Sequence, residues 1–274
     1  MRWWCTCATL LAALAAAAPL RAQPDEGDAL VRALVSALRP ALPFPEAGPD
    51  GIPATGGADP VWVVRWPEAG DGHVEVLANP LNAENRKRAL AAEEEIQKAA
   101  MRSQRRSQGD YERALSDFER TGRVSGIREI SLDDDGLAGE RYDAESHLLV
   151  SVAPLDGDLS FSVATGVLPE LVAGIAGPAA VIHVPANVFE MRAEPGEPAE
   201  EHYCSEQAWL VFGASGSATI APRDHSPHVD VTVPVAAPPA GRRGVVVSLS
   251  GNPLLVDQAL RRADWPALRA ALGN

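Results

Sequence analysis

Alternating apolar and polar residues predict several short β-strands along the chain. The clearest alternation spans residues 159–164, where Leu, Phe and Val alternate with Ser and Ala, and residues 73–78 and 229–235 alternate in a similar way. Successive side chains of a strand point to opposite faces of its sheet, so this pattern predicts strands with one buried face. Pro234 has no backbone N–H to donate, which favours an edge position for strand 229–235.

Apolar runs between turn-forming residues predict the remaining strands. These lie at 61–66, 127–132, 141–152, 179–184, 207–212, 217–221 and 244–249. Most connections between successive strands are short, whereas a parallel return needs a crossover of about a dozen residues or more. We therefore predict an α+β fold that consists mainly of antiparallel β-sheet.

One segment stands apart because of its helix-forming composition. Residues 83–120 contain no proline and a single glycine, Gly109, and they are dense in Ala, Glu, Arg, Lys and Gln. At 1.5 Å per residue, a single helix here would be about 57 Å long. The alternative is a helical hairpin that breaks at 107–110, with Asp110 capping its second helix. The sequence alone leaves both arrangements open.

The charges of this segment are nearly balanced, and its apolar or small residues form one narrow stripe. The stripe consists of Ile96, Ala100, Ser103, Ser107, Tyr111, Ala114 and Phe118. The helix is therefore either a solvated element with ion pairs along its surface or an arm. Such an arm would either pair as a coiled coil with a helix of a partner protein or of a second copy, or lie across the acidic body of its own chain. The residues expected to contact such a partner are Arg102, Arg105, Arg106 and Tyr111.

A shorter helix is predicted near the N-terminus. Residues 28–39 carry apolar side chains at helical spacing, with Asp28 as a candidate N-cap and Pro40 just beyond the end. The stretch 40–60 is rich in Pro and Gly, so we expect it to be a linker that tethers this helix to the main body.

Two further helices are predicted in the second half of the chain. Residues 167–184 are mostly apolar but contain Pro and Gly, which predicts a short buried helix followed by a core strand. A C-terminal helix follows Asn252 and restarts at Asp264, since both residue types accept hydrogen bonds from free N–H groups at helix starts.

Two stretches of the chain share one layout. Residues 61–81 and 229–254 each contain two strands joined by a Pro/Gly-containing loop and then Asn-Pro-Leu before a helix. Asn caps a helix and Pro is tolerated in its first turn, so the layout reflects either convergence on a good helix start or two similar sheet-plus-helix halves. The predicted division is a signal peptide at 1–22, a short helix and linker at 23–59, a β-rich domain at 60–165 that includes the long helix, and a second β-rich half at 166–274.

The first 22 residues have the pattern of an export signal. Met1-Arg2 is followed by an uncharged, mostly apolar run to Leu20 and by a small residue, Ala22. Cleavage there would leave Cys204 as the remaining cysteine, which we expect to be buried. The alternative is an uncleaved membrane anchor. The expected location is the periplasm or the exterior of the cell, with no stable membrane span once the signal is removed.

The overall charge restricts the partners that the protein can bind. The formal net charge is −13 at pH 7, which disfavours nucleic acid as a partner because its phosphate backbone is also negative. No phosphate-binding loop or dinucleotide-binding fingerprint occurs.

Candidate chemistry is concentrated in one loop. Asp224, His225, His228 and Asp230 place two carboxylates and two imidazoles within seven residues, a set that suits a divalent metal ion. The loop matches neither H-E-x-x-H nor paired C-x-x-C, and no cofactor is expected apart from such an ion. The favoured function is therefore that of an exported, non-catalytic binding or envelope-associated protein. The alternatives are a metal-dependent hydrolase and a structural subunit of a larger assembly.

Overall fold

The computed structural model describes most of the chain beyond the predicted signal segment. The described residues are 24–54, 59–67, 72–121, 137–155, 157–192, 199–213, 216–224, 226–235 and 244–273. The predicted signal peptide and the predicted strand 127–132 lie outside these residues, so both stay predictions.

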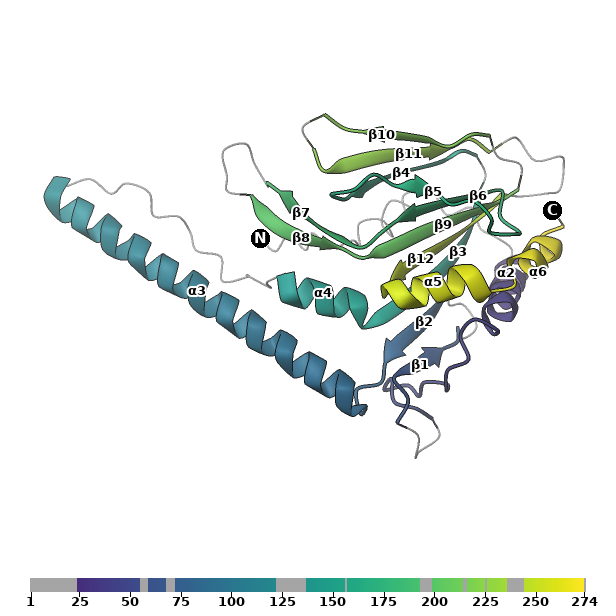
Figure 1. Cartoon of the computed structure of the whole chain (residues 1–274), viewed down its shortest axis with the longest axis horizontal. Helices are drawn as coiled ribbons and strands as arrows, with labels where there is room; N and C mark the ends of the chain where they lie inside the picture. Colours follow the sequence, from purple (N-terminus) through teal and green to yellow (C-terminus); the bar gives the residue numbers. More distant parts are fainter. Residues whose placement is uncertain are drawn as a thin grey trace.

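The protein has an α+β fold with antiparallel sheets, which confirms the predicted class (Figure 1). A seven-stranded sheet has the order β1-β2-β3-β12-β9-β6-β5, a three-stranded sheet has the order β10-β11-β4, and β7 and β8 form a separate pair. The strands are β1 (Trp62–Arg65), β2 (His73–Ala78), β3 (His147–Leu155), β4 (Leu159–Ala164), β5 (Glu170–Leu171), β6 (Ala180–Val184), β7 (Asn187–Met191), β8 (Glu200–Cys204), β9 (Glu206–Phe212), β10 (Thr219–Pro222), β11 (His228–Val233) and β12 (Gly244–Gly251).

The core consists of two apolar layers on opposite faces of the large sheet. One layer lies between the two larger sheets, where the rings of Phe161 and Trp209 have centroids 4.2 Å apart and Val231 is fully buried. The other layer lies under the helices α2 (Pro24–Leu38), α5 (Pro253–Arg262) and α6 (Trp265–Ala271). Cys204 is buried, as the sequence predicted, and it belongs to the first layer.

Helix α2 belongs to the main core, so the prediction of a tethered helix is wrong. Leu34 and Leu38 are fully buried against the helices and strands of the second apolar layer, and the Asp264 N–H donates to Ala37 O at 2.9 Å. The helix also begins at Pro24, before the predicted cap. Its apolar side needs an apolar surface to cover it, and α6 provides much of that surface.

The predicted strand 141–152 is wrong in its first part. Helix α4 spans Leu137–Glu145, and strand β3 starts only at His147. Arg141 and Glu145 form an ion pair of 2.7 Å at helical i,i+4 spacing, which strand geometry would not bring together. The apolar alternation that does predict a strand begins in β3, where Leu148 and Val150 are buried.

The predicted buried helix in 167–184 is also wrong, although the strand after it is confirmed as β6. Its residues form the short strand β5 and an irregular stretch in which Gly174 and Gly177 have φ of 85° and 109°. A Cβ on Gly177 would lie 2.6 Å from the backbone of Trp265. Close approach of α6 and left-handed φ values therefore replace helical geometry here.

Strand β11 lies in the centre of its sheet, so the predicted edge position is wrong. It pairs with β10 on one side and β4 on the other. Pro234 does not interrupt either ladder because β11 ends at Val233, and Pro234 instead accepts the Gly216 N–H at 2.7 Å. Proline restricts a strand only where its missing N–H is needed.

The large sheet draws strands from both of the predicted β-rich segments. Strand β12 lies between β3 and β9, while β2 borders β3 on its other side. The Asn-Pro-Leu turns therefore leave the sheet on either side of the start of β3. Ala78 donates to Ser146 O and Asn252 donates to His147 O, both at 2.8 Å.

The two Asn-Pro turns differ in which residue caps the helix. Asn252 caps α5, as predicted, and accepts hydrogen bonds from the N–H groups of Leu254 and Leu255. In the other copy, Asn82 accepts from the N–H groups of Glu84 and Asn85, so the helix α3 (Ala83–Thr121) starts three residues later than Asn79 would place it. The predicted restart at Asp264 is confirmed by its hydrogen bond to the Ala267 N–H.

Candidate functional site

Helix α3 (Ala83–Thr121) is the most extended element of the molecule. Its 39 residues continue through Gly109 as one helix, which corresponds to about 58 Å. Figure 1 shows that only the start of the helix lies near the sheets and that the rest projects away from them. The side chains of several residues in its second half lie outside the described structure.

Buried amide side chains fix the base of α3. Asn82 and Asn85 are 7% and 4% exposed. The Asn82 amide donates to Asp59 O at 3.1 Å, and the Asn85 amide donates to Val61 O at 2.9 Å and to Asn79 O at 3.1 Å. These bonds tie the first turn of the helix to the turn before it and to the chain that enters β1.

The first half of α3 packs against α4 through small residues. Its half-buried stripe has heptad spacing and consists of Ala89, Ala92, Ile96 and Ala99. Ile96 fits against Gly139 of α4, where an added Cβ would lie 3.1 Å from the Ile96 side chain. Of the residues in the predicted stripe, Ile96 is half-buried and Ala100 is exposed. The side chains of the later members, from Ser103 onward, lie outside the described residues.

Carboxylates of α4 join this helix pair to strand β8. The Glu145 carboxylate forms ion pairs with Arg88 of α3 at 3.1 Å and with Arg141 at 2.7 Å. It also accepts a hydrogen bond from the Tyr203 hydroxyl at 3.3 Å. Glu140 accepts the Tyr203 N–H at 2.9 Å. Helix α4 therefore covers one edge of strand β8 through charge-assisted hydrogen bonds, and α3 is connected to this strand through α4.

Tyr203 is held in its neutral form at this junction. Burial and the neighbouring Glu145 carboxylate raise its pKa to about 12, because both disfavour a phenolate. The phenol consequently remains a hydrogen-bond donor to Glu145 at physiological pH. The Arg141 guanidinium lies 5.9 Å from the centre of the same ring. This is a satisfied structural network rather than an arrangement with a free nucleophile.

The predicted binding residues lie beyond this junction. Arg102 and Arg105 are exposed, and neither makes an ion pair or hydrogen bond in the described part of the chain. The side chains of Arg106 and Tyr111 lie outside the described residues, so their roles stay predictions. Lys98 is engaged within the helix by Glu94 at 2.9 Å and Glu95 at 3.0 Å.

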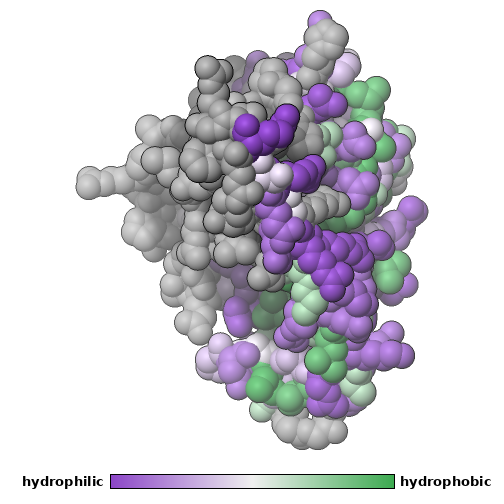
Figure 2. Space-filling view, turned by 90° about the vertical axis from the view of Figure 1, so that its left-hand side faces the viewer, coloured by the Kyte–Doolittle hydropathy of each residue, from purple (hydrophilic) through white to green (hydrophobic). Residues whose placement is uncertain are grey.

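The surface on the side of the molecule from which α3 projects contains both hydrophilic and hydrophobic residues. Figure 2 views the molecule from that side, and its described residues are mostly hydrophilic with separate hydrophobic areas between them. On α3 itself, Leu90 and Met101 are 65% and 59% exposed. They lie 11 residues apart, close to three helical turns, and so share a face of the helix.

The predicted metal-binding loop is arranged differently from a metal site at the residues that are described. Arg223 approaches both carboxylate oxygens of Asp230, at 2.7 and 2.8 Å, and holds the pKa of Asp230 below its usual value. His228 Nδ1 lies 2.9 Å from the Ser226 hydroxyl. Within the described part of the chain, no three His, Cys, Asp or Glu side chains converge as metal ligands. His225 lies outside that part, so the four-residue metal set, with Asp224, stays a prediction.

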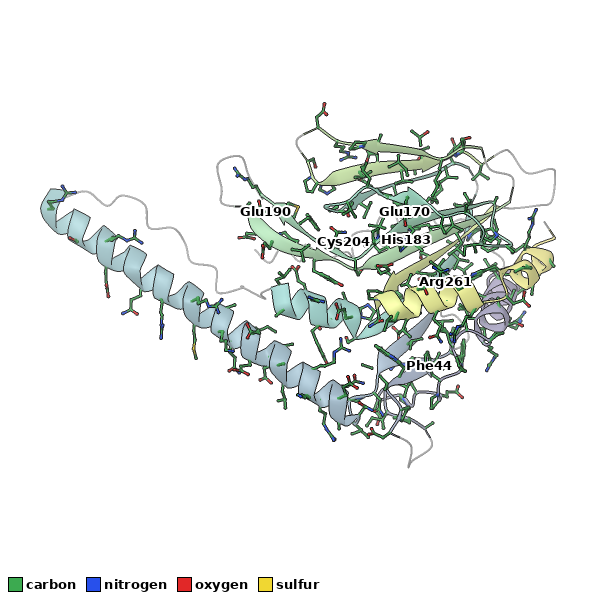
Figure 3. All side chains as sticks on the ribbon, viewed as in Figure 1. Phe44, Glu170, His183, Glu190, Cys204 and Arg261 are labelled. Atoms are coloured by element: carbon green, nitrogen blue, oxygen red, sulfur yellow. The ribbon has the colours of Figure 1, made fainter. Side chains whose placement is uncertain are left out.

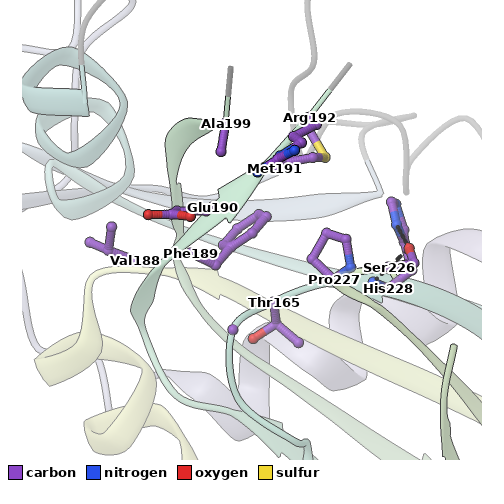
Figure 4. Close-up of a pocket in the computed structure, with 11 residues that line it drawn as sticks. Thr165, Val188, Phe189, Glu190, Met191, Arg192, Ala199, Ser226, Pro227 and His228 are labelled. Carbon is purple, nitrogen blue, oxygen red and sulfur yellow. Dashed lines mark hydrogen bonds between the residues drawn. The ribbon is translucent and has the colours of Figure 1, made fainter. Parts of the chain in front are cut away.

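An open groove of about 750 Å³ lies between β7 and the ends of β4 and β11 (Figure 4). Its lining combines the apolar side chains of Phe189, Met191 and Pro227 with polar groups that include Glu190 and His228. Sequence reasoning missed this groove because strands β7 and β8 lack a clear alternation of apolar residues. Their pairing continues that of β6 and β9, because β6 leads into β7 and β8 leads into β9.

Comparison with known proteins gives no relative for this chain: no family model, curated protein or solved structure matches it. Among the described residues, no helix combines the length and apolar character that a membrane crossing requires.

Proposed function

We propose that the chain is an exported, periplasmic protein without catalytic activity, which binds a partner protein along α3. The observation that carries the proposal is a helix whose first half is fixed to the body and whose remaining length projects from it. The predicted export signal supports the location. Since the described side chains in the outer part of the helix are mostly exposed, a partner is the natural occupant of that surface.

The charge and apolar pattern of α3 defines the surface that a partner would meet. Leu90 and Met101 lie on the side of the helix opposite the half-buried stripe, as the 100° rotation per residue requires. Arg105 lies beside the face that carries Leu90 and Met101, and Arg102 is the residue after Met101. A partner helix with apolar residues and nearby carboxylates would bury the apolar side chains and pair with the arginines, in the manner of a coiled coil.

The sharpest test removes the outer arm and keeps its base. Deleting residues 100–121 retains the packed stripe up to Ala99, and the following fifteen residues are long enough to reach Leu137. We expect the truncated protein to unfold cooperatively like the full chain but to lose capture of a partner from the native envelope fraction. A truncation that unfolds the body, or one that keeps full capture, would contradict the proposal.

Point variants then separate a specific surface from a general loss of charge. Arg102→Gln with Arg105→Gln is expected to weaken capture at least tenfold, whereas the control Arg86→Gln with Lys87→Gln changes the same number of charges near the base and is expected to have little effect. Light scattering of the purified chain distinguishes a partner protein from a second copy, which would indicate a structural subunit.

The competing proposal is a metal-dependent hydrolase that uses Asp224, His225, His228 and Asp230. Asp230 would have to leave Arg223 in order to bind a cation, which counts against this proposal. Elemental analysis after expression with zinc and manganese tests it directly. Stoichiometric metal that is lost in His228→Ala would favour the hydrolase over the binding protein.

A further inference from the structure

Strands β6 and β7, together with β8 and β9, form one long β-ribbon that is interrupted once. Val184 pairs with Gln207 at the end of the β6–β9 ladder, and Asn187 pairs with Cys204 at the start of the β7–β8 ladder. The two ladders are three residues apart on each strand, so the register continues across the break without a bulge. Figure 1 shows that the ribbon changes direction at this point.

The chemistry of the break explains why the ladder stops. Pro185 has no N–H to donate to the opposite strand. The next amide, that of Ala186, donates instead to the side chain of Glu206, with a distance of 2.6 Å to Oε2. A carboxylate thus replaces a backbone carbonyl as the acceptor at the bend.

The same carboxylate is held by a histidine. Oε1 of Glu206 lies 2.5 Å from His183 Nε2, and the other ring nitrogen, Nδ1, lies 3.0 Å from Glu170 of β5. The side chains of His183 and Glu206 are 15% and 13% exposed, whereas Glu170 is 63% exposed. Figure 3 shows His183 and Glu170 close together on neighbouring strands.

We propose that Glu206 and His183 form a protonation-dependent latch that fixes the bend of the ribbon. A charged imidazolium has two N–H groups and donates to both carboxylates, while a neutral imidazole has one and leaves a carboxylate facing a ring lone pair. Loss of the proton weakens the hold on Glu206 in either tautomer, because the neutral ring either faces Glu206 with a lone pair or donates to it without the charge that strengthens the bond. A carboxylate that is held less firmly also holds the Ala186 N–H less firmly. The proposal concerns the ribbon and goes beyond the binding role of α3.

The bend that the latch fixes sets the position of both strands beyond it, β7 and β8. Strand β7 forms a wall of the groove at Phe189 and Met191. Strand β8 carries Tyr203, whose bonds to Glu140 and Glu145 position α4 and through it α3. A change of bend would therefore alter the groove and the base of the arm together.

The direction of the pH dependence follows from the groups around the ring. Glu206 of β9 and Glu170 of β5 face His183, and both raise its pKa, with the Glu206 hydrogen bond as the main cause. Glu206 in turn faces His183 and influences the Tyr203 phenol of β8, which stays neutral until far higher pH. The latch is therefore closed at and below the ordinary histidine pKa of about 6.5 and opens as the pH rises through the raised value.

Hydrogen exchange of the Ala186 amide tests the latch in the full-length protein. After correction for the intrinsic pH dependence of exchange, we expect wild-type exchange at Ala186 to quicken about three- to tenfold as His183 loses its proton, the factor that corresponds to loss of one hydrogen bond. An NMR titration of the His183 ring supplies the matching pKa. In His183→Gln, the corrected exchange rate should not change with pH.

The two carboxylates provide a matched pair of variants. Glu170→Gln removes a neighbour of the same ring that does not touch the ribbon break, so it should lower the pKa of His183 and leave the closed-state protection of Ala186 intact. Glu206→Gln keeps an acceptor oxygen for the Ala186 N–H but removes the carboxylate charge, so it should weaken both the protection and its pH dependence. The latch is excluded if Ala186 keeps its pH-dependent exchange in His183→Gln. If the Glu206→Gln protein does not fold, the His183→Gln measurement alone decides.

Discussion

At the scale of single residues, buried amide side chains connect elements that are distant in the sequence. Asn252 shows the principle most fully: its oxygen accepts from Leu254 and Leu255, and its amide donates to Glu145 O at 2.7 Å. One side chain therefore caps α5 and also holds the end of α4. The cap was predictable from sequence, whereas the bond to α4 depends on the fold.

Replacing Asn252 with Ala is expected to lower the free energy of unfolding by about 2 kcal/mol, because a buried carbonyl and two helix N–H groups lose their partner. Urea unfolding measures the change. Asp264→Ala is the control, since within the described structure that side chain accepts only the Ala267 N–H, at an exposed position, and its loss should cost about 1 kcal/mol. Equal losses in both variants would indicate that the bond from Asn252 to Glu145 contributes nothing.

At the scale of elements, packing decides several conformations that local sequence leaves open. The carboxylates of α4 meet Arg88 and Tyr203 from two neighbouring elements, and these contacts stabilise a helix in a segment whose sequence was also compatible with a strand. The end of β12 shows the same influence on a strand. Gly251 has φ of 137°, and an added Cβ would lie 2.2 Å from His147 O.

Gly251→Ala is expected to destabilise the protein by about 3 kcal/mol or more, through both the unfavourable φ and the clash with β3. Gly174→Ala is the matched control, because Gly174 also has positive φ, at 85°, but has open space where the Cβ would be. It should cost about 1 kcal/mol. Thermal unfolding of the two variants separates the conformational cost from the steric one, and equal midpoints would rule out the close approach.

At the scale of the whole molecule, the central sheet joins segments from both halves of the chain. Strand β12, near the C-terminus, lies between β3 and β9 and pairs with both. A chain that lacks it exposes an edge of β3 and loses the surface on which the helices pack.

A fragment of residues 24–165 is therefore expected not to fold alone, although it matches the predicted first β-rich segment and its linker. Its circular dichroism should show no cooperative thermal transition under conditions in which the full chain has one. A sharp transition in the fragment would mean that this half is an independent domain. The complementary fragment 166–274 serves as the comparison.

Much of the secondary structure was determined by sequence because it depends on local patterns. Alternating apolar residues determined β2 and β4, and Asn252 and Asp264 determined the starts of α5 and α6, since burial periodicity and capping act over a few residues. The buried state of Cys204 followed from the apolar run beside it. The same local patterns placed the candidate metal residues in one loop but gave no information on Arg223, seven residues before Asp230, as its partner.

The tertiary structure alone decided the features that depend on contacts between distant segments. These are the helical state of α4, the burial of α2, the central place of β11, the groove beside β7 and the meeting of His183, Glu206 and Glu170. Each arises because a buried apolar surface or a charged group must find a partner, and the partner comes from a strand or helix that the local pattern does not specify. The carboxylates around His183 come from β5 and β9, and sheet pairing is what brings them to one imidazole.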